Sequence, residues 1–248
     1  MPYTEQTVTS VRKWSDKTFS LTTTRAEDFQ FANGEFVTIG LRSEGKLIAR
    51  AYSIVSTNDQ DYLEFLSIHI PDGPLTSHLA NVSAGDGVWI NSKSTGTLTL
   101  KHIQPGRNLY LLSTGTGVAP FMSIIRDAVS YDHFEHIVLV HSVRHLAELA
   151  YNEEIAAMNN ECLLYVPTVT REAFPTPQRG ADLFRSGELF TQLGLPNADP
   201  AKDRVMLCGN PNMNKEMAAY LKDQGWSETN HSGIGNFTTE KAFAIRKE

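Results

Sequence analysis

The sequence has 248 residues, of which 41% are hydrophobic and 20% charged, a composition typical of a globular protein with one large or two modest domains. A net charge of −6 argues against non-specific nucleic-acid binding, and no apolar run approaches the roughly 20 residues of a membrane-spanning helix. The charged start MPYTEQTVTSVRKW shows no signal peptide, and Cys162 and Cys208 are too few and too far apart for a cysteine-ligated metal cluster. We therefore expect a cytoplasmic protein without a metal site, a nucleic-acid partner or a membrane partner.

The chain from Thr7 to about Leu100 has the pattern of short strands separated by turn-forming pairs such as Asn33-Gly34 and Asp86-Gly87. Six strands at this spacing predict an antiparallel barrel or sandwich. One short helix is expected in PLTSHLANV, residues 74–82. The six predicted strands are TFSLTTT, EFVTIGL, RAYSIVS, YLEFLSIHI, DGVWINSK and GTLTL.

After IQPGR the pattern changes to alternating strands and helices, which predicts a parallel α/β sheet. The change places a domain boundary near residues 101–107, so we expect one domain over 1–102 and another over 103–248. The predicted strands are NLYLLS, HIVLVHS, CLLYVPTVT and RVMLCG, and the predicted helices lie in PFMSIIRDAV, ELAYNEEIAAM, LFTQLG and PNMNKEMAAYLKDQG.

The stretch RAYSIVS alternates like a strand, yet it places Arg50 and Tyr52 on the same face. An edge strand with a solvated face would explain this pattern. A ligand with a flat ring at one end and a phosphate at the other would explain it equally.

A glycine turn, LLSTGTGVAP, connects the first predicted parallel strand to a helix. Gly115 and Gly117 let a ligand approach the backbone, and the free N–H groups of the helix start suit a phosphate. Pro120 fits the first turn of that helix. The spacing G-x-G-x-x-P lacks the third glycine of the dinucleotide fingerprint, so a plain connecting turn is an equal alternative.

Arginines follow the next two strands and point to a phosphate. The strand after the glycine turn ends in Ser142 and offers Arg144 where an NAD site keeps an acidic residue, which suits a 2′-phosphate. Arg171 and Arg179 follow the third strand, although each alone could be a solvated arginine. Cys208 ends the fourth strand beside a glycine, as a small buried side chain or as a group at the ligand edge.

With RAYSIVS, GPLTSHL, STGTGVAPF, VTRE…QRG and CGNP in this order, the chain resembles bacterial ferredoxin–NADP⁺ reductases. The resemblance runs from about Phe19 to the C-terminus and favours the subclass that ends in an Ala-Phe extension, here Ala242-Phe243. It implies a six-stranded antiparallel Greek-key β-barrel that binds FAD, followed by a Rossmann-like parallel α/β domain that binds NADP(H).

The resemblance also implies residue roles in the barrel. Arg50 would pair with the pyrophosphate of FAD, Tyr52 would stack on the isoalloxazine ring, and Ser53 would bond near the flavin N5. The other residues implied at the FAD site are Ala51, Leu66, Ser67, Ile68, Gly73, Pro74, Leu75 and Thr76.

In the second domain, the resemblance places Thr116 against the flavin and Gly117 against NADP. Cys208 and Gly209 would lie beside the nicotinamide. The tail would lay Ala242 over the flavin ring and Phe243 against the adenine, unless Phe243 only closes a core. Ser53, Cys208 and Ala242 are thus the candidates at the reacting rings. The 2′-phosphate side would be held by Val143, Arg144, Thr170, Arg171 and Arg179.

Some positions depart from the family pattern. The tail AFAIRKE is longer and more basic than usual, Gly180-Ala181 stands where a threonine is usual, and His78 replaces a common arginine. Glu240 could relay a proton, but we expect it to be an exposed tail carboxylate.

The implied activity is hydride exchange between NADP(H) and flavin, with single electrons passed to or from ferredoxin or flavodoxin. Since such carriers are usually acidic, we expect a local basic docking surface. We also expect the protein to be a monomer. A flavin reductase, the reductase component of an oxygenase system, and a nucleotide-sensing flavin-binding protein remain alternatives. The candidate docking residues are Lys93, Lys101, Arg246 and Lys247.

Overall fold

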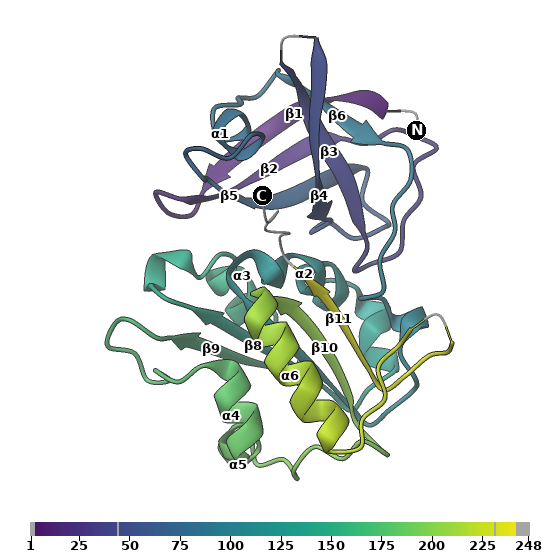
Figure 1. The fold of residues 1–248 in the computed structure, drawn as a ribbon, viewed down its shortest axis with the longest axis vertical. Coiled ribbons are helices and arrows are strands. Elements are labelled where there is room, and N and C mark those ends of the chain that lie inside the picture. The colour runs from purple at the N-terminus through teal and green to yellow at the C-terminus, as the bar shows by residue number, and fades with distance from the viewer. Residues whose placement is uncertain (1–2, 44, 231, 242–248) are drawn as a thin grey trace.

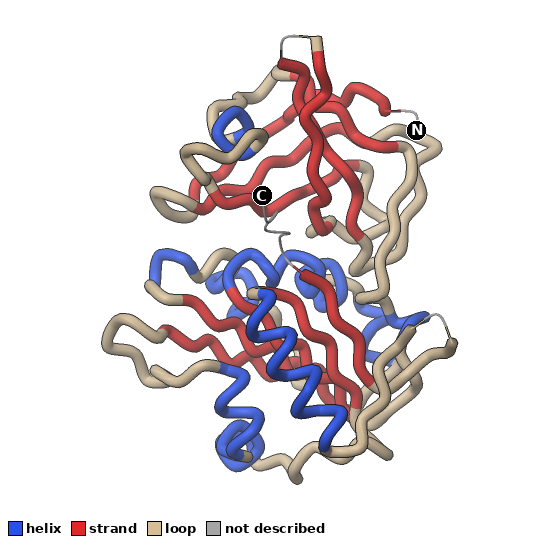
Figure 2. Tube along the Cα trace, viewed as in Figure 1, coloured by secondary structure: helices blue, strands red, loops and turns tan. Residues whose placement is uncertain are grey.

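The computed structural model describes residues 3–43, 45–230 and 232–241, and it shows two stacked lobes (Figure 1). The N-terminal lobe consists of β-strands and one short helix, and the C-terminal lobe consists of a sheet with helices on both faces (Figure 2). The proposed boundary between residues 102 and 103 falls at the end of a 3₁₀ turn, Leu100–His102, which lies between the two sheets in sequence. Residues 242–248 are outside the described residues, and so are the predicted roles of Ala242 and Phe243.

The N-terminal lobe is an antiparallel sheet of six strands in the order β4-β3-β6-β1-β2-β5. A one-turn helix, α1 (Thr76–Leu79), lies within the predicted segment 74–82. The strands are β1 (Tyr3–Lys13), β2 (Thr18–Thr24), β3 (Phe36–Ser43), β4 (Lys46–Ser53), β5 (Tyr62–Ile68) and β6 (Gly87–Asn91).

The two edge strands of this sheet, β4 and β5, meet and close it into a barrel. An antiparallel bridge joins Ile54 to Phe65, and the Val55 amide donates to the Glu64 carbonyl at 2.9 Å. The Tyr52 hydroxyl and the Ser67 hydroxyl lie 3.1 Å apart across the same seam. The predicted six-stranded barrel is therefore confirmed, and the RAYSIVS stretch forms its seam.

One of the six predicted strands is wrong, and one observed strand was not predicted. GTLTL forms no strand: Thr97 bonds to the side chain of Glu240, and Leu98 is buried between the lobes. Strand β1 takes its place in the barrel. Its sequence carries little periodic signal because Val8 is its only fully buried residue.

The C-terminal lobe is a parallel sheet of five strands in the order β11-β10-β7-β8-β9. Its central strand β7 (Asn108–Thr114) is almost entirely buried, as the continuous apolar run predicted. The other strands are β8 (His136–Val143), β9 (Leu163–Val169), β10 (Arg204–Gly209) and β11 (Phe237–Lys241).

Helices cover both faces of this sheet, as expected of an α/β domain. On one face lie α2 (Ala119–Ile125) and α3 (Asn152–Ala157), and on the other lie α4 (Gly180–Ser186), α5 (Glu188–Leu193) and α6 (Pro211–Asp223). Pro120 and Pro211 occupy the first turns of their helices, as predicted.

Three details of this lobe differ from prediction. Helix α3 begins at Asn152 rather than at 148, because Tyr151 before it has a left-handed backbone with φ of 64°. Helix α4 precedes the predicted helix α5, and strand β11 adds an edge to the sheet. Glu240 belongs to β11, so it is a half-buried strand residue rather than an exposed tail carboxylate.

A substitution at Gly34 tests how closely this turn packs against the backbone of Leu98. Gly34 has φ of 95°, and a Cβ there would overlap the Leu98 carbonyl and lie 3.4 Å from Ile124 of α2. We expect Gly34→Ala to lower the free energy of unfolding by about 3 kcal/mol or more, because strain and overlap add. Gly225→Ala is the control: φ is 84°, a Cβ there would have no described atom within 4 Å, and a loss of about 1–2 kcal/mol is expected. Equal losses in urea unfolding would contradict this packing.

Candidate active site

A cavity of about 590 Å³ opens at the carboxyl ends of the parallel strands. Its floor is formed by the residues that end β7, β8 and β9, together with the first turn of α6. Thr18, Leu66 and Ile68 of the barrel form its opposite wall. The cavity therefore lies between the two lobes, at the edge where open α/β sheets bind their ligands.

The glycine turn after β7 forms part of this floor. Gly115 has φ of 54°, and a Cβ built on it would meet no atom of the described residues within 4 Å, so nothing in that part of the chain covers its backbone. Gly117 is different, because a Cβ there would collide with the Cys208 carbonyl. Gly209 packs equally closely against Thr114. The ends of β7 and β10 thus touch backbone to backbone, and Gly115 leaves the room for a ligand.

A buried histidine forms a hydrogen bond to the backbone of this turn. His141 of β8 is fully buried, and its Nε2–H donates to the Gly115 carbonyl at 3.0 Å. This bond leaves the lone pair of Nδ1 without a hydrogen-bond partner among the described residues. Burial lowers the pKa of His141 to about 4, although the bond to Gly115 acts in the opposite direction. The imidazole is therefore neutral at neutral pH.

The three predicted arginines, Arg144, Arg171 and Arg179, all line the cavity. Backbone bonds join their loops: the Thr170 amide donates to Val143, and the Arg171 amide donates to the Arg144 carbonyl at 2.9 Å. The structure thus brings together residues that are far apart in sequence.

Ser142 is the side chain that ties the Arg179 loop to the sheet. Its hydroxyl oxygen accepts the Gly180 amide and the Thr168 hydroxyl, each at 2.9 Å. Among the described residues, neither Arg171 nor Arg179 forms an ion pair, whereas Arg144 lies 3.7 Å from Glu148. Unpaired guanidinium groups beside a cavity suit a phosphate.

Several cavity residues were not predicted from the sequence. Arg185 of α4 lines the cavity and pairs with Asp182 one turn earlier. Because α4 was not predicted, the pattern A-D-L-F-R was not assigned to a helix face. The other unpredicted cavity residues include Thr18, Leu112, Ser113, Thr114, Val140, Glu148, Asn210, Asn212, Met213 and Glu216.

The proposed flavin motif lies on edge strand β4, outside this cavity. Arg50 and Tyr52 pair with the buried Ile39 and Val37 of β3, so both side chains belong to one side of the sheet. Arg50 is exposed, and its Nη1 donates to the Ala49 carbonyl at 2.7 Å. Burial raises the pKa of Tyr52, although its bond with Ser67 and the nearby Arg50 charge act in the opposite direction. Ala51 is exposed and Ser53 half-buried.

The segment proposed for the FAD pyrophosphate lies at α1. The Leu75 side chain is buried in the barrel, so only its backbone could meet a ligand. The Thr76 hydroxyl donates to the Ile70 carbonyl, and Gly73 has no room for a Cβ beside that hydroxyl. Pro74 is exposed.

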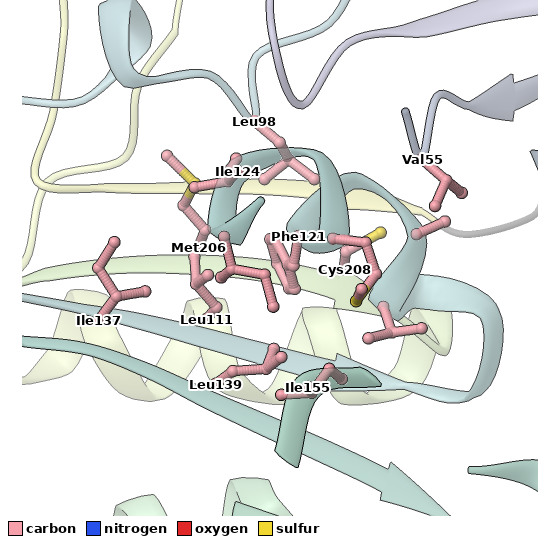
Figure 3. Close-up of a cluster of buried hydrophobic side chains, with 14 of the residues drawn as sticks. Val55, Leu98, Leu111, Phe121, Ile124, Ile137, Leu139, Ile155, Met206 and Cys208 are labelled. Carbon is pink, nitrogen blue, oxygen red and sulfur yellow. The ribbon is translucent and has the colours of Figure 1, made fainter. Parts of the chain in front are cut away.

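Cys208 lies in the hydrophobic core that also contains Phe121 and Met206 (Figure 3). It is 1% exposed, and burial raises the pKa of its thiol well above the ordinary range. The thiol therefore stays protonated, which excludes a thiolate nucleophile here. Glu240 is its register partner in β11 and accepts the Thr97 amide; burial raises the pKa of this carboxyl.

His141 should make the fold sensitive to acid. Its pKa is about 4 in the folded protein and about 6.5 in the unfolded chain, so below pH 6.5 the unfolded state binds more protons. Between pH 7 and pH 4, the free energy of unfolding of the wild type should therefore fall by on the order of 3 kcal/mol more than that of His141→Gln. The glutamine keeps an N–H donor for Gly115 but does not titrate. Parallel urea-unfolding stabilities across this pH range would contradict the assignment.

Known families match both lobes. Residues 6–99 match the family described as "Oxidoreductase FAD-binding domain", and residues 111–219 match the "Oxidoreductase NAD-binding domain". In the described residues, no helix is long and apolar enough to cross a bilayer.

Full-length relatives are named ferredoxin–NADP reductases. The chain is 46% identical to ferredoxin–NADP reductase A of Sorangium cellulosum, covering 99% of this chain and 92% of the relative. It is 45% identical to the ferredoxin–NADP reductase of Pseudomonas aeruginosa, covering 97% of each. A crystal structure of a Neisseria gonorrhoeae ferredoxin NADP⁺ reductase with bound FAD and NADP has a TM-score of 0.92 at 30% identity, covering 98% of this chain and 100% of that one. The chain therefore belongs to the ferredoxin–NADP reductase family.

Proposed function

We propose that this protein exchanges a hydride between NADP(H) and bound FAD and passes single electrons to or from a ferredoxin or flavodoxin. The observation that carries the proposal is the shared cavity. Arg144, Arg171 and Arg179 line it on one side, while Leu66 and Ile68 of the barrel line it on the other. A nucleotide held by the arginines would thus reach the barrel strand proposed to face the flavin.

The residues of the α/β lobe would bind and orient NADP(H). Arg171 and Arg179 form no ion pair within the described part of the chain, so both would pair with a 2′-phosphate, and Arg144 would join them on the neighbouring loop. The open backbone at Gly115 would let the nucleotide approach the sheet, with the adjacent Thr116 at the flavin side. Val143 and Thr170 would support the adenosine end. Cys208 and Gly209 would form the backing of the nicotinamide end.

The residues of the barrel would bind FAD, which when bound supplies the capacity to take two electrons and release them singly. Tyr52 offers a ring fixed at the seam, and Arg50 offers an exposed guanidinium on the same side of the sheet. Ser53 would bond to the flavin edge, Leu66, Ser67 and Ile68 would line the flavin, and Gly73 to Thr76 would meet the pyrophosphate through their backbone.

An electron carrier would dock on exposed basic side chains. Lys93 is exposed, whereas Lys101 forms an ion pair with Glu35 at 3.2 Å. Of these two lysines, Lys93 is therefore the better candidate for contact with the carrier. Arg246 and Lys247 are outside the described residues. We propose a monomer that meets its carrier transiently.

The direct test is the absorbance of the purified protein under anaerobic conditions. We expect oxidised-flavin bands that NADPH bleaches far faster than NADH does, because only NADPH carries the 2′-phosphate. A flavin that NADPH leaves oxidised would indicate a binding protein without turnover. Reduction of free flavin in preference to ferredoxin or flavodoxin would indicate a flavin reductase.

Replacing Arg171 and Arg179 by alanine tests the phosphate site. A hydrogen bond to a charged group contributes about 1.5–3 kcal/mol, so each substitution should lower the NADPH/NADH preference in kcat/KM by about tenfold or more. Arg42→Ala is the matched control, since this arginine stacks over Trp89 on the barrel with 4.3 Å between its Cζ and the ring centroid. An unchanged preference in the Arg171 and Arg179 variants would contradict the assignment.

A further inference from the structure

A buried ionic cluster joins the two lobes at the carboxyl end of α2. Its centre is Arg126, the C-terminal cap of that helix, whose side chain is only 14% exposed. Nε and Nη2 donate to the two carboxylate oxygens of Glu154 on α3, at 2.7 and 3.0 Å. Nη1 donates across the lobe boundary, to Glu64 of β5 at 2.8 Å and to the Val55 carbonyl at 3.1 Å.

A second side chain of the α/β lobe holds the other oxygen of Glu64. The Tyr151 hydroxyl donates to Glu64 Oε1 at 2.7 Å, so both oxygens of this barrel carboxylate are bound from the opposite lobe. Tyr151 is 1% exposed and packs against Trp14 of the barrel, with ring centroids 4.6 Å apart and the ring planes tilted by 55°. Its left-handed backbone is costly for a residue with a side chain, and such strain persists only where the surroundings fix it.

The charges of the cluster favour a permanent ionic state. Burial acts to lower the pKa of Arg126, but the bonds and charges of Glu154 and Glu64 outweigh it and raise the pKa. Removing the guanidinium would leave the largely buried carboxylate of Glu64 and the half-buried carboxylate of Glu154 without their shared positive charge, which is unfavourable. The three groups therefore act as a unit.

The cluster is built on the elements that carry the cofactor sites. Glu64, Leu66 and Ile68 alternate along β5, so all three face the α/β lobe; the first belongs to the cluster and the other two wall the cavity. On the other side, α2 runs from the glycine turn to Arg126. Ser123 of α2 adds a further link, donating to the Ser56 carbonyl at 2.8 Å, next to Val55.

We propose that Arg126, with Glu64, Glu154 and Tyr151, is a domain clamp that fixes the distance between the flavin wall and the nicotinamide end of the cavity. These are positioning residues: none of them lines the cavity, and they act through β5 and α2. The proposal rests on the proposed function. The rate of hydride transfer falls steeply when the reacting atoms move apart by about 1 Å. A loosened clamp should therefore slow the transfer rather than weaken nucleotide binding.

The test is Arg126→Met in the FAD-loaded protein, mixed anaerobically with NADPH. We expect the limiting rate of flavin bleaching to fall at least tenfold, while FAD content and the Kd for 2′-phospho-AMP change less than twofold. That probe meets only the α/β lobe. Arg126→Lys keeps the charge but loses the forked bonds, so it should recover part of the rate.

Arg107→Met is the matched control. Arg107 also forms a forked ion pair, with the buried Asp203 at 3.0 and 2.7 Å. This pair lies at the amino ends of β7 and β10, whereas the cavity lies at the carboxyl ends of the strands. The substitution should lower stability without slowing bleaching in the folded protein. An unchanged limiting rate in Arg126→Met, or a fall matched by Arg107→Met, would overturn the clamp.

Further variants separate the clamp from folding and from the proposed function. Should Arg126→Met not fold, Glu154→Gln keeps the link to Glu64 and should slow bleaching about threefold; no slowing there or in Arg126→Lys would overturn the clamp. A wild-type flavin that NADPH does not bleach would overturn the proposed function and the clamp together. A bleached wild type with a normal Arg126→Met rate would overturn the clamp alone.

Discussion

The structure depends on the burial of helix α2 between the parallel sheet and the barrel. All seven of its residues are buried, which no amphipathic helix on a protein surface would show. Its apolar cluster includes Leu111 and Leu139 of the sheet on one side and Val55 of the barrel on the other (Figure 3). Leu66 of the barrel belongs to the same cluster. One apolar cluster therefore spans the boundary between the lobes, and neither lobe can move away without exposing it.

The burial of α2 has a consequence for the cofactor sites. A helix of seven residues is about 10 Å long and rigid. Its amino end carries the glycine turn that His141 holds from below, and its carboxyl end carries Arg126. A side chain at each end thus fixes the helix, so the turn is held in place relative to strand β5. The imidazole of His141 is fully buried and the guanidinium of Arg126 is largely buried, which strengthens their bonds compared with bonds in water.

The sequence predicted the two sheets well because each has its own period. Alternating short runs predicted the barrel, and continuous apolar runs such as that of β7 predicted buried parallel strands. The sequence-based prediction was wrong where the alternation of apolar and polar side chains does not match the strands. Strand β1 is mostly exposed on both faces, and Thr97 and Leu98 are held by groups distant in sequence rather than by a ladder.

The predicted site divides along similar lines. Arginines that end successive parallel strands must meet at one sheet edge, and the structure brings Arg144, Arg171 and Arg179 to one cavity. Cys208 and Glu240 could not be placed in advance, because their burial depends on the packing of β11. The Arg126 cluster was equally hidden, since Glu64, Arg126 and Glu154 follow no shared spacing.

The seam of the barrel explains why an arginine and a tyrosine share one side of the strand RAYSIVS. Beyond Tyr52 the chain crosses from β4 toward β5, and the bridge at Ile54 completes the closure. Ahead of this crossing Arg50 reaches solvent although its register partner Ile39 is fully buried. Tyr52 has its hydroxyl bonded to Ser67 and its ring against Phe65, with centroids 6.5 Å apart. A flat ligand would therefore meet a tyrosine whose position is already set, and little side-chain entropy would be lost on binding.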